Sequence, residues 1–284
     1  MPAKFFALSG FTLTLALATL TPEASAAIIT FDGVDGYSTT GGTALNGELR
    51  GQPSPVAATK WAGPDQVPAR INVIQDSAPG ENAAQTQPGI VGTNFTQYTF
   101  TPSATDLGGT LDANASVVNY SINLRFDDPD YTGAGNNDFI AVQRVRFGSE
   151  NVARFQLFSG GRFSYHVGST VERQASTTLG GTTRFVGTED VYFNVAGQFN
   201  YATNTYTLLV NGVPQTTADG GTNVNIPFFN AAASTADVRL FNLNSENTNW
   251  RRVSVDDLTV AIPEPTTALS LGLIGAFGLL KRRR

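Results

Sequence analysis

Alternation of apolar and polar residues is the sequence feature that most constrains the fold. In SVVNYSINLRF, residues 116–126, every second position is apolar. Successive side chains of a β-strand point to opposite faces, so a period of two predicts a strand with one buried and one solvent-facing side. The expected buried face is Val118, Tyr120, Ile122, Leu124 and Phe126, and the expected polar face is Asn119, Ser121, Asn123 and Arg125. This pattern is typical of an antiparallel sheet that covers a core on one side.

The same alternation recurs through the second half of the chain. Further strands are predicted at 139–148, 153–158, 162–167, 190–200, 205–210, 237–244 and 252–262. Clusters of Gly, Asn, Asp and Ser separate them, and no long helical period appears between residues 27 and 262. Asn211-Gly212 predicts a tight hairpin, because both residues tolerate a positive φ, and 158–162 predicts a second one. The pattern predicts an all-β sandwich or barrel.

Two segments resemble the concanavalin A-like jelly roll, the laminin-G or lectin type of sandwich. YATNTYTLLVNGV, residues 201–213, looks like the strand-turn-strand of that family, and VSVDDLTV, residues 253–260, looks like its closing strand. The resemblance implies an antiparallel two-sheet jelly-roll sandwich over 27–262, with the closing strand paired near the opening segment AIITFDG. Residues 33–94 are poorer in strands and are expected to contribute loops. Lectins, glucanases, lyases and adhesion modules share this fold, so it selects no activity.

The first 26 residues have the pattern of a secretory signal peptide. Lys4 precedes a mostly apolar run from Phe5 to Leu20, and Ala24 and Ala26 place small residues at positions −3 and −1 of a cleavage site. We expect a signal peptide helix over 1–26, removed by cleavage after Ala26. The alternative is a short buried helix.

The end of the chain combines a proline motif, an apolar run and a cluster of cations. These are Pro263, Glu264 and Pro265, then residues 267–280, then Lys281, Arg282, Arg283 and Arg284. As a helix the run would extend roughly 21 Å, against about 30 Å of bilayer hydrocarbon, so it is marginal as a permanent span. A temporary anchor, held until an enzyme cuts it, is the more economical interpretation.

These three parts, in this order, resemble the PEP-CTERM sorting signal of Gram-negative bacteria. The resemblance covers 262–284 and implies a hydrophobic sorting helix over 263–284. It also implies transient anchoring in the inner membrane and an exosortase-type membrane peptidase as a transient partner. The expected destination is the cell surface or the extracellular matrix. An ordinary C-terminal anchor remains the alternative.

Charge and cysteine content exclude several classes of function. The chain has no Cys and one His, which excludes disulfides, thiolate metal sites, a cysteine nucleophile and any metal site with two imidazoles. The net charge is −5, and removal of the two basic ends leaves a still more acidic body with Lys60 as its single lysine. Nucleic acid is therefore not an expected partner, because neutralising phosphates requires clustered cations.

The sequence identifies no catalytic residues. His166 is expected on the polar side of its strand, either solvated or structurally bonded. A glycosidase needs two carboxylates about 5 to 10 Å apart, but Asp256 and Asp257 are expected on opposite faces of their strand. Jelly-roll lyases use a Tyr or His base with Arg, Gln or Asn near the uronate. Arg144, Arg146, Tyr165 and His166 are compatible types, although arginines on an exposed strand are ordinary.

The loop DDPDYTGAGNNDF, residues 127–139, is rich in hard oxygen donors. The candidate calcium ligands are Asp127, Asp128, Asp130, Asn136, Asn137 and Asp138. Calcium takes six to eight such oxygens and tolerates irregular geometry, and it would relieve the repulsion among the carboxylates. A solvated turn without a metal is equally compatible with this sequence.

Three aromatic residues are candidates for stacking on sugar rings. They are Trp61, Tyr131 on the acidic loop, and Trp250 beside Asn247 and Asn249. Burial in the core is the alternative for each tryptophan. The function expected from the sequence is non-catalytic binding of polysaccharide or another surface component by an exported protein. A polysaccharide lyase or glycoside hydrolase and a structural matrix protein are the alternatives.

Overall fold

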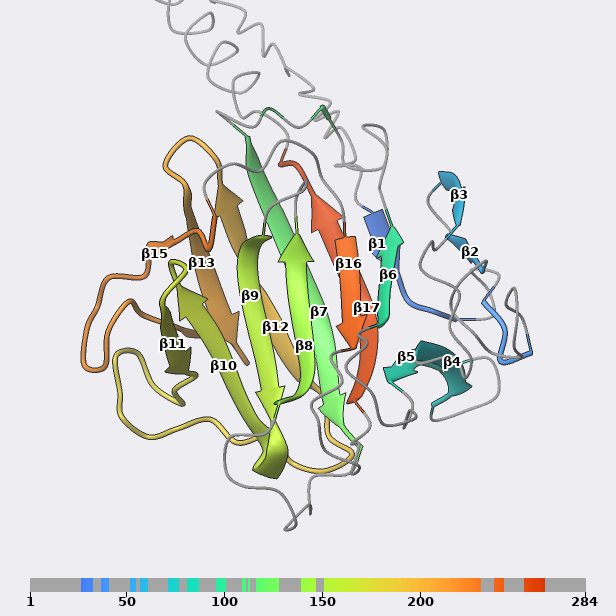
Figure 1. Cartoon of the computed structure of the whole chain (residues 1–284), viewed down its shortest axis with the longest axis horizontal. Coiled ribbons are helices and arrows are strands. Elements are labelled where there is room, and N and C mark those ends of the chain that lie inside the picture. The colour runs from blue at the N-terminus through green and yellow to red at the C-terminus, as the bar shows by residue number, and fades with distance from the viewer. Residues whose placement is uncertain are drawn as a thin grey trace, which may run out of the picture.

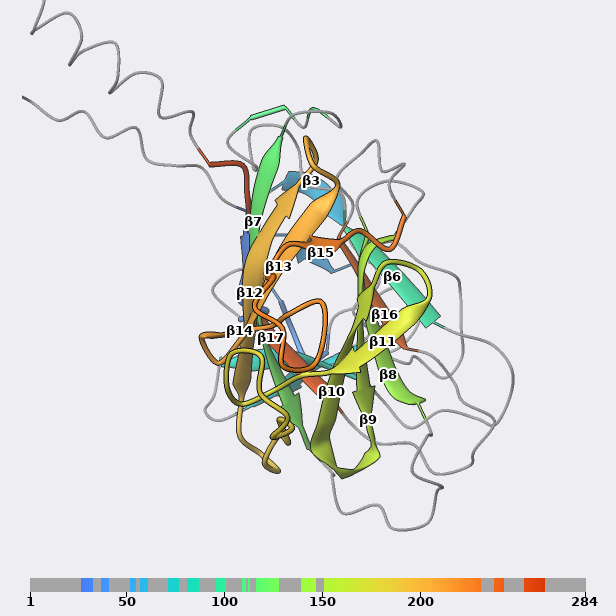
Figure 2. The same ribbon diagram turned by 90° about the vertical axis from the view of Figure 1, so that its left-hand side faces the viewer.

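The computed structural model of the chain describes fourteen segments. They are residues 27–32, 37–40, 52–54, 57–60, 71–76, 81–86, 96–100, 109–110, 112, 116–127, 139–146, 151–230, 238–242 and 253–263. Their strands form two large sheets, which lie face to face in Figures 1 and 2, and a separate short hairpin. Neighbouring strands within the sheets pair in antiparallel fashion.

The larger sheet is built around β7, and the smaller sheet around β8 and β9. The larger sheet has the order β14 (Val213–Pro214), β13 (Thr205–Val210), β12 (Phe193–Asn200), β7 (Val117–Phe126), β17 (Val253–Ala261), β5 (Asn82–Thr86) and β4 (Ile71–Gln75), with β1 (Ala27–Ile29) on β17 and β15 (Ile226–Pro227) on β13. The smaller sheet has the order β11 (Val171–Gln174), β10 (Arg162–Val167), β9 (Asn151–Phe158), β8 (Phe139–Arg146), β16 (Val238–Asn242) and β6 (Thr96–Phe100). The hairpin is β2 (Pro53–Ser54) with β3 (Ala57–Lys60).

The hydrophobic core lies between the two sheets. Burial alternates along β7 as its sequence predicts, with buried residues at every second position. The ring of Phe155 from β9 lies 5.9 Å from that of Tyr120 and 6.3 Å from that of Tyr206, both in the larger sheet. Phe163 and Phe193 make a further contact between the sheets, with ring centroids 5.7 Å apart. The predicted all-β architecture with two antiparallel sheets is therefore confirmed.

Both predicted hairpins are present, and each uses positive φ angles. Asn211 (φ 48) and Gly212 (φ 77) join β13 to β14. A 3-10 turn at Ser159–Gly161 joins β9 to β10, with φ of 70 at Gly160 and 72 at Gly161. Glycine and asparagine adopt this conformation at little cost, so these residues determine where the strands reverse direction.

The opening and closing strands pair, as the sequence predicts. Ala27 of β1 is opposite Val260 of β17, and Ile29 is opposite Leu258. The expectation for residues 33–94 is incomplete, because β4 and β5 extend the larger sheet beside β17. β5 contributes only alanine to the apolar surface, Ala83 and Ala84, which explains its weak sequence pattern.

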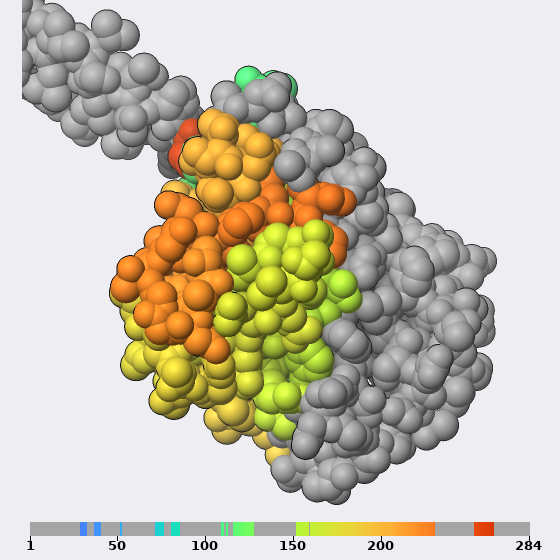
Figure 3. Space-filling view, turned by 60° about the vertical axis from the view of Figure 1, so that its left-hand side comes forward, coloured from blue at the N-terminus to red at the C-terminus, as the bar shows by residue number. Residues whose placement is uncertain are grey.

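The sandwich closes along one edge, where the segment after β14 meets β10 and the residues after β11. Figure 3 shows this orange segment against the yellow-green surface. Gln215 accepts a hydrogen bond from Ser176 N (2.7 Å) and donates to Ser176 O (3.1 Å). The Tyr165 hydroxyl donates to Thr216 O (2.6 Å). These bonds connect the two sheets outside the apolar core.

The predicted terminal helices lie outside the described residues. This applies to the signal peptide over 1–26 and, apart from Pro263, to the sorting segment 263–284. In the part of the chain that the structure describes, no helix has the length and apolar character to cross a membrane.

Candidate functional site

The side of the larger sheet that faces away from the core carries closely spaced polar residues. We call it the polar face, and define it by Asn119, Ser121, Asn123 and Arg125 of β7, Tyr192, Asn194, Ala196, Gln198 and Asn200 on and just before β12, Thr205, Thr207 and Leu209 of β13, and Ser254, Asp256 and Thr259 of β17. Strand register aligns them in rows. Thr207 is opposite Gln198, which is opposite Asn119. Asn194 is likewise opposite Asn123, which is opposite Asp256.

Amide side chains connect neighbouring strands of the polar face. Gln198 Nε2 donates to Asn119 Oδ1 (2.9 Å). Asn194 Nδ2 donates to Ser121 Oγ and to Asn123 Oδ1, both at 2.9 Å. We call these five residues the amide ladder. Within the described part of the chain, Asn119 Nδ2, Gln198 Oε1 and Asn194 Oδ1 have no hydrogen-bonding partner. The ladder is therefore ordered by its own bonds and keeps both donors and acceptors for a ligand.

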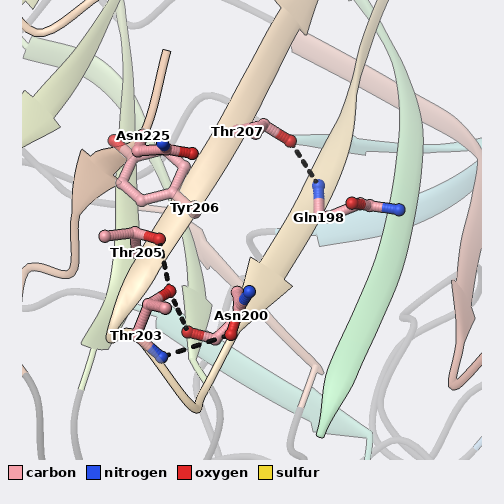
Figure 4. Close-up of a pocket in the computed structure, with 7 residues that line it drawn as sticks. All are labelled: Gln198, Asn200, Thr203, Thr205, Tyr206, Thr207 and Asn225. Atoms are coloured by element: carbon pink, nitrogen blue, oxygen red, sulfur yellow. Dashed lines mark hydrogen bonds between the residues drawn. The ribbon is translucent and has the colours of Figure 1, made fainter. Parts of the chain in front are cut away.

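A hollow of about 290 Å³ lies over β12 and β13 (Figure 4). Its lining consists of Gln198, Asn200, Thr203, Thr205, Tyr206, Thr207 and Asn225. Thr203 N donates to Asn200 Oδ1 (3.2 Å), and the hydroxyls of Thr203 and Thr205 are 2.7 Å apart. Gln198 N donates to Thr207 Oγ1 (3.0 Å), as the dashed line in Figure 4 shows. The lining side chains are therefore neutral hydroxyl and amide groups, and several of them are ordered by hydrogen bonds.

A second hollow, of about 500 Å³, adjoins the first and shares Gln198 and Thr207 with it. Its other lining residues include an apolar set, Ala196, Leu209, Pro214 and Val224. We call the two hollows together the groove. One side of the groove thus offers hydrogen bonds and the other an apolar surface.

Gly197 allows the strands beneath the groove to approach closely. A Cβ at this position would lie 2.0 Å from Thr207 O and 3.0 Å from the Tyr120 hydroxyl. The Tyr120 hydroxyl donates a hydrogen bond to Thr207 O (3.1 Å). Only glycine leaves room for this bond, so Gly197 keeps the groove floor intact.

A compact ionic cluster lies at the other end of the polar face. Arg125 forms ion pairs with Asp76 and Asp127 and lies 4.8 Å over the ring of Tyr192. Asp127 Oδ2 accepts hydrogen bonds from Ser254 Oγ and from Gln85 Nε2, both at 2.7 Å. Burial opposes the charge of Arg125, but its hydrogen bonds to Asp127 and Asp76 outweigh this effect and raise its pKa. The cluster satisfies its own charges, which is typical of a structural role.

Asp256 is the carboxylic acid among the residues that define the polar face, and its pKa lies well above the usual value. Burial, and to a smaller degree the charges of Asp257, Asp32 and Asp76, raise its pKa to about 7 against an opposing hydrogen bond from Asp257 N. The strand register shifts between Asp256 and Thr259, and Asp257 has a φ of 47. Because this β-bulge adds one residue, Asp257 Oδ2 meets Asn123 Nδ2 (2.8 Å) on the polar face. The expectation that Asp256 and Asp257 point to opposite faces is therefore wrong.

His166 lies on the side of the smaller sheet that faces away from the core, opposite Glu172 of β11. It is only 9% exposed, its Nε2 is 3.2 Å from the side-chain amide of Gln156, and its ring meets Phe229 edge-on. The Gln156 amide, turned so that its oxygen faces Arg154, bonds to Arg154, His166 and Glu172 together. Of the two expectations for His166, structural bonding is the one observed.

Most site residues predicted from the sequence lie outside the described residues. These are Ala24, Ala26, Trp61, Asp128, Asp130, Tyr131, Asn136, Asn137, Asp138, Trp250, Glu264, Pro265 and Arg282–Arg284. Of the candidate calcium ligands, Asp127 is described, and both its carboxylate oxygens already accept hydrogen bonds. The described residues include no group of three or more His, Asp or Glu placed to hold a metal. The calcium site stays a prediction for the rest of the loop.

The groove residues were not singled out by the sequence patterns. The one signal for them in the sequence is the row of neutral polar residues along the alternating strands 190–200 and 205–210. Such a row indicates the outer face of a sheet, but it does not distinguish a binding site from ordinary surface. Asn225, which completes the first hollow, follows a region without periodicity.

No family model matches the chain, and no curated protein matches it in sequence. Solved structures resemble it in part. A sialidase aligns over 71% of this chain, which spans 17% of that protein, with a TM-score of 0.44 and 10% identity. A cellulose-induced protein, Cip1, aligns over 71% of this chain and 91% of its own, with a TM-score of 0.43 and 14% identity. The catalytic domain of a glycoside hydrolase family 131 protein from Coprinopsis cinerea aligns over 72% and 83%, with a TM-score of 0.42 and 13% identity. These values assign the chain to no family and no activity.

Proposed function

We propose that the chain is a non-catalytic carbohydrate-binding protein of the cell surface or extracellular matrix, and that polysaccharide binds in the groove. The observation that carries this proposal is the lining of the groove. Hydroxyl and amide side chains lie beside an apolar wall, in a hollow over β12 and β13. A sugar presents the matching chemistry, because its hydroxyls both donate and accept hydrogen bonds and its ring C–H groups are apolar.

The ionisation of the lining residues favours binding over catalysis. Among the described residues that line the groove there is no carboxylate and no histidine. The hydroxyls of Tyr120 and Tyr206 donate to backbone carbonyls, and burial raises the pKa of both phenols well above the usual value. Neither tyrosine is suited to exchange a proton with a substrate near neutral pH.

Binding of the purified protein to a glycan array, followed by calorimetric titration, tests this proposal. Substituting Thr205→Val or Asn225→Ala removes one polar group of the first hollow, and each is expected to weaken binding about 5- to 10-fold. Thr170→Val, on the exposed turn between β10 and β11, is the matched control and should bind like the wild type. Unchanged affinity in both groove variants, or no glycan binding at all, would contradict the proposal.

Export and sorting are part of the same proposal. Residues 1–26 act as a signal peptide, and 263–284 act as a PEP-CTERM signal that an exosortase-type peptidase processes. The body between these two signals is a jelly roll of the concanavalin A-like type, and the pairing of β1 with β17 supports this assignment. Mass spectrometry of the protein from its native host provides the test. Mature protein that still contains Leu279 and Leu280 would show that the tail is not removed.

One observation favours a polysaccharide lyase as the second candidate. Arg154, Gln156 and His166 meet on the outer side of the smaller sheet. A lyase of this fold needs a base together with Arg, Gln or Asn to neutralise the uronate, and these three side chains have those chemical types. Incubation with polyuronates, monitored by the absorbance of unsaturated uronate, tests it. If the wild type forms unsaturated product and His166→Asn does not, the protein is a lyase and not a non-catalytic binding protein. Self-association without glycan binding would instead indicate a matrix protein.

A further inference from the structure

We infer that the occupant of the groove is an uncharged polysaccharide chain that extends across the strands of the polar face, from β13 over the amide ladder to β17. This inference rests on the proposed function and defines the class of ligand. Its basis is that the polar groups continue past the groove. Asn194, Ser121 and Asn123 do not line either hollow, yet they carry the ladder from β12 to β7, and Asn123 continues it to Asp257.

A row of short side chains gives the polysaccharide a path out of the groove. Ala196 lines the second hollow and is opposite Ser121, which is opposite Thr259 of β17. The longer pair Gln198 and Asn119 lies on one side of this row, and the longer pair Asn194 and Asn123 lies on the other. Adjacent strands are about 4.8 Å apart, so the path from β13 to β17 is roughly 14 Å long. A single sugar ring would occupy only part of it.

The unused hydrogen-bonding groups lie on both sides of the row. Asn119 Nδ2 and Gln198 Oε1 are on one side and Asn194 Oδ1 on the other, and none of them has a partner among the described residues. Their amide planes are already held by bonds within the ladder. A ligand that binds there therefore orders few additional side chains, which reduces the entropic cost of binding.

The charges of the polar face select against an anionic ligand. Arg125 is the one cation among the residues that define this face, and Asp76 and Asp127 neutralise it. Asp256 lies at the end of the path with Asp257 beside it. Asp257 therefore lies where a uronate or sulfate group would have to enter, with no unpaired cation of the polar face beside it, so a neutral polymer complements this surface.

Calorimetric titration with oligosaccharides of two lengths tests the inference. The probes are the di- and hexasaccharides of β-1,4-linked glucose, mannose and N-acetylglucosamine, with hexagalacturonate as the anionic counterpart. We expect a neutral hexasaccharide to bind at least 10-fold more tightly than its disaccharide and than hexagalacturonate. Asn123→Ala should lower the ratio of hexasaccharide to disaccharide affinity, whereas Asn225→Ala should weaken both ligands. Thermal melts confirm that both variants are folded.

The outcomes separate this inference from the proposed function. Equal affinities for the two lengths, or a ratio unchanged in Asn123→Ala, would overturn the extended path while leaving carbohydrate binding in place. Tighter binding of hexagalacturonate would overturn the choice of an uncharged ligand. A protein that binds none of these sugars and nothing on a glycan array contradicts the proposed function itself.

Discussion

At the scale of single residues, Asp256 shows how a β-bulge changes the chemistry of a surface. Alternation along the strand would place Asp256 and Asp257 on opposite faces, too far apart for one to affect the acidity of the other strongly. The bulge after Asp256 instead brings Asp257 onto the polar face, where it bonds to Asn123. Burial and the nearby charges of Asp257, Asp32 and Asp76 then disfavour a second negative charge at Asp256.

The acidity of Asp256 predicts how stability depends on pH. Its pKa is about 7 in the folded protein and about 4 in an unfolded chain, so between these values the folded state binds the extra proton. The free energy of unfolding should therefore fall as the pH rises from about 4 to 7, and this contribution should be constant above pH 7. Asp256→Asn should show a flatter profile and be more stable than the wild type at pH 8. Urea denaturation at several pH values measures both.

Asp219→Asn is the matched control for this experiment. Hydrogen bonding to Arg184 lowers the pKa of Asp219, so its stabilising contribution is lost only as the pH falls below the ordinary range of a carboxylate. This variant should leave the slope between pH 5 and 8 unchanged. If Asp256→Asn retained the wild-type dependence of the unfolding free energy on pH, a group other than Asp256 would cause that dependence.

At the scale of elements, the ionic cluster connects strands that are distant in sequence. Arg125 at the end of β7 pairs with Asp76, which follows β4, and with Asp127, which also bonds to Ser254 of β17. The side chains of Arg125, Asp76 and Asp127 are 14%, 10% and 7% exposed. Solvent therefore screens these pairs only weakly, and loss of the cation leaves two carboxylates without compensation.

Arg125→Met should destabilise the protein through this cluster. Removing one partner of a buried ion pair costs about 3 kcal/mol of unfolding free energy, measured by urea denaturation at pH 7. Arg184→Met provides the comparison, because its pair with Asp219 is far more exposed and should be worth less than about 1 kcal/mol. Equal losses in the two variants would show that the Arg125 cluster does not stabilise the contacts among β4, β7 and β17.

At the scale of the whole molecule, the two sheets are held together by the apolar core and by the hydrogen-bonded edge at Gln215. This side chain is 1% exposed and bonds to both backbone groups of Ser176 and to Val213 O. The same segment then supplies Val224 and Asn225 to the groove. Closure of the sandwich and construction of the groove therefore depend on one stretch of chain.

Gln215→Ala should weaken this closure. It removes the hydrogen-bonding partner of the two buried backbone groups of Ser176, which costs about 2 to 4 kcal/mol of unfolding free energy. Gln198→Ala on the exposed polar face is the control and should cost less than about 1 kcal/mol. Denaturation curves for the two variants measure the difference. A loss no larger in Gln215→Ala than in Gln198→Ala would contradict the assigned role of the edge.

The sequence alone determined the local features of the fold. Alternation in residues 116–126 identified β7 and its buried face, 162–167 and 205–210 matched β10 and β13, and Asn211-Gly212 identified the hairpin. These features are predictable because side-chain direction in a strand and the φ preference of a turn depend only on adjacent residues. β5 was missed, because two alanines do not stand out from their neighbours.

Only the tertiary structure decided which residues meet. The bulge at Asp256, the pairing of Arg125 with Asp76 and the hollows over β12 and β13 all depend on strand register and on contacts between distant segments. Asn225 and Gln198 acquire a shared role only when β15 pairs beside β13. The reason is physical: a polar strand face has the same sequence pattern whether water or a ligand covers it, and only folding sets the shape and spacing that distinguish the two.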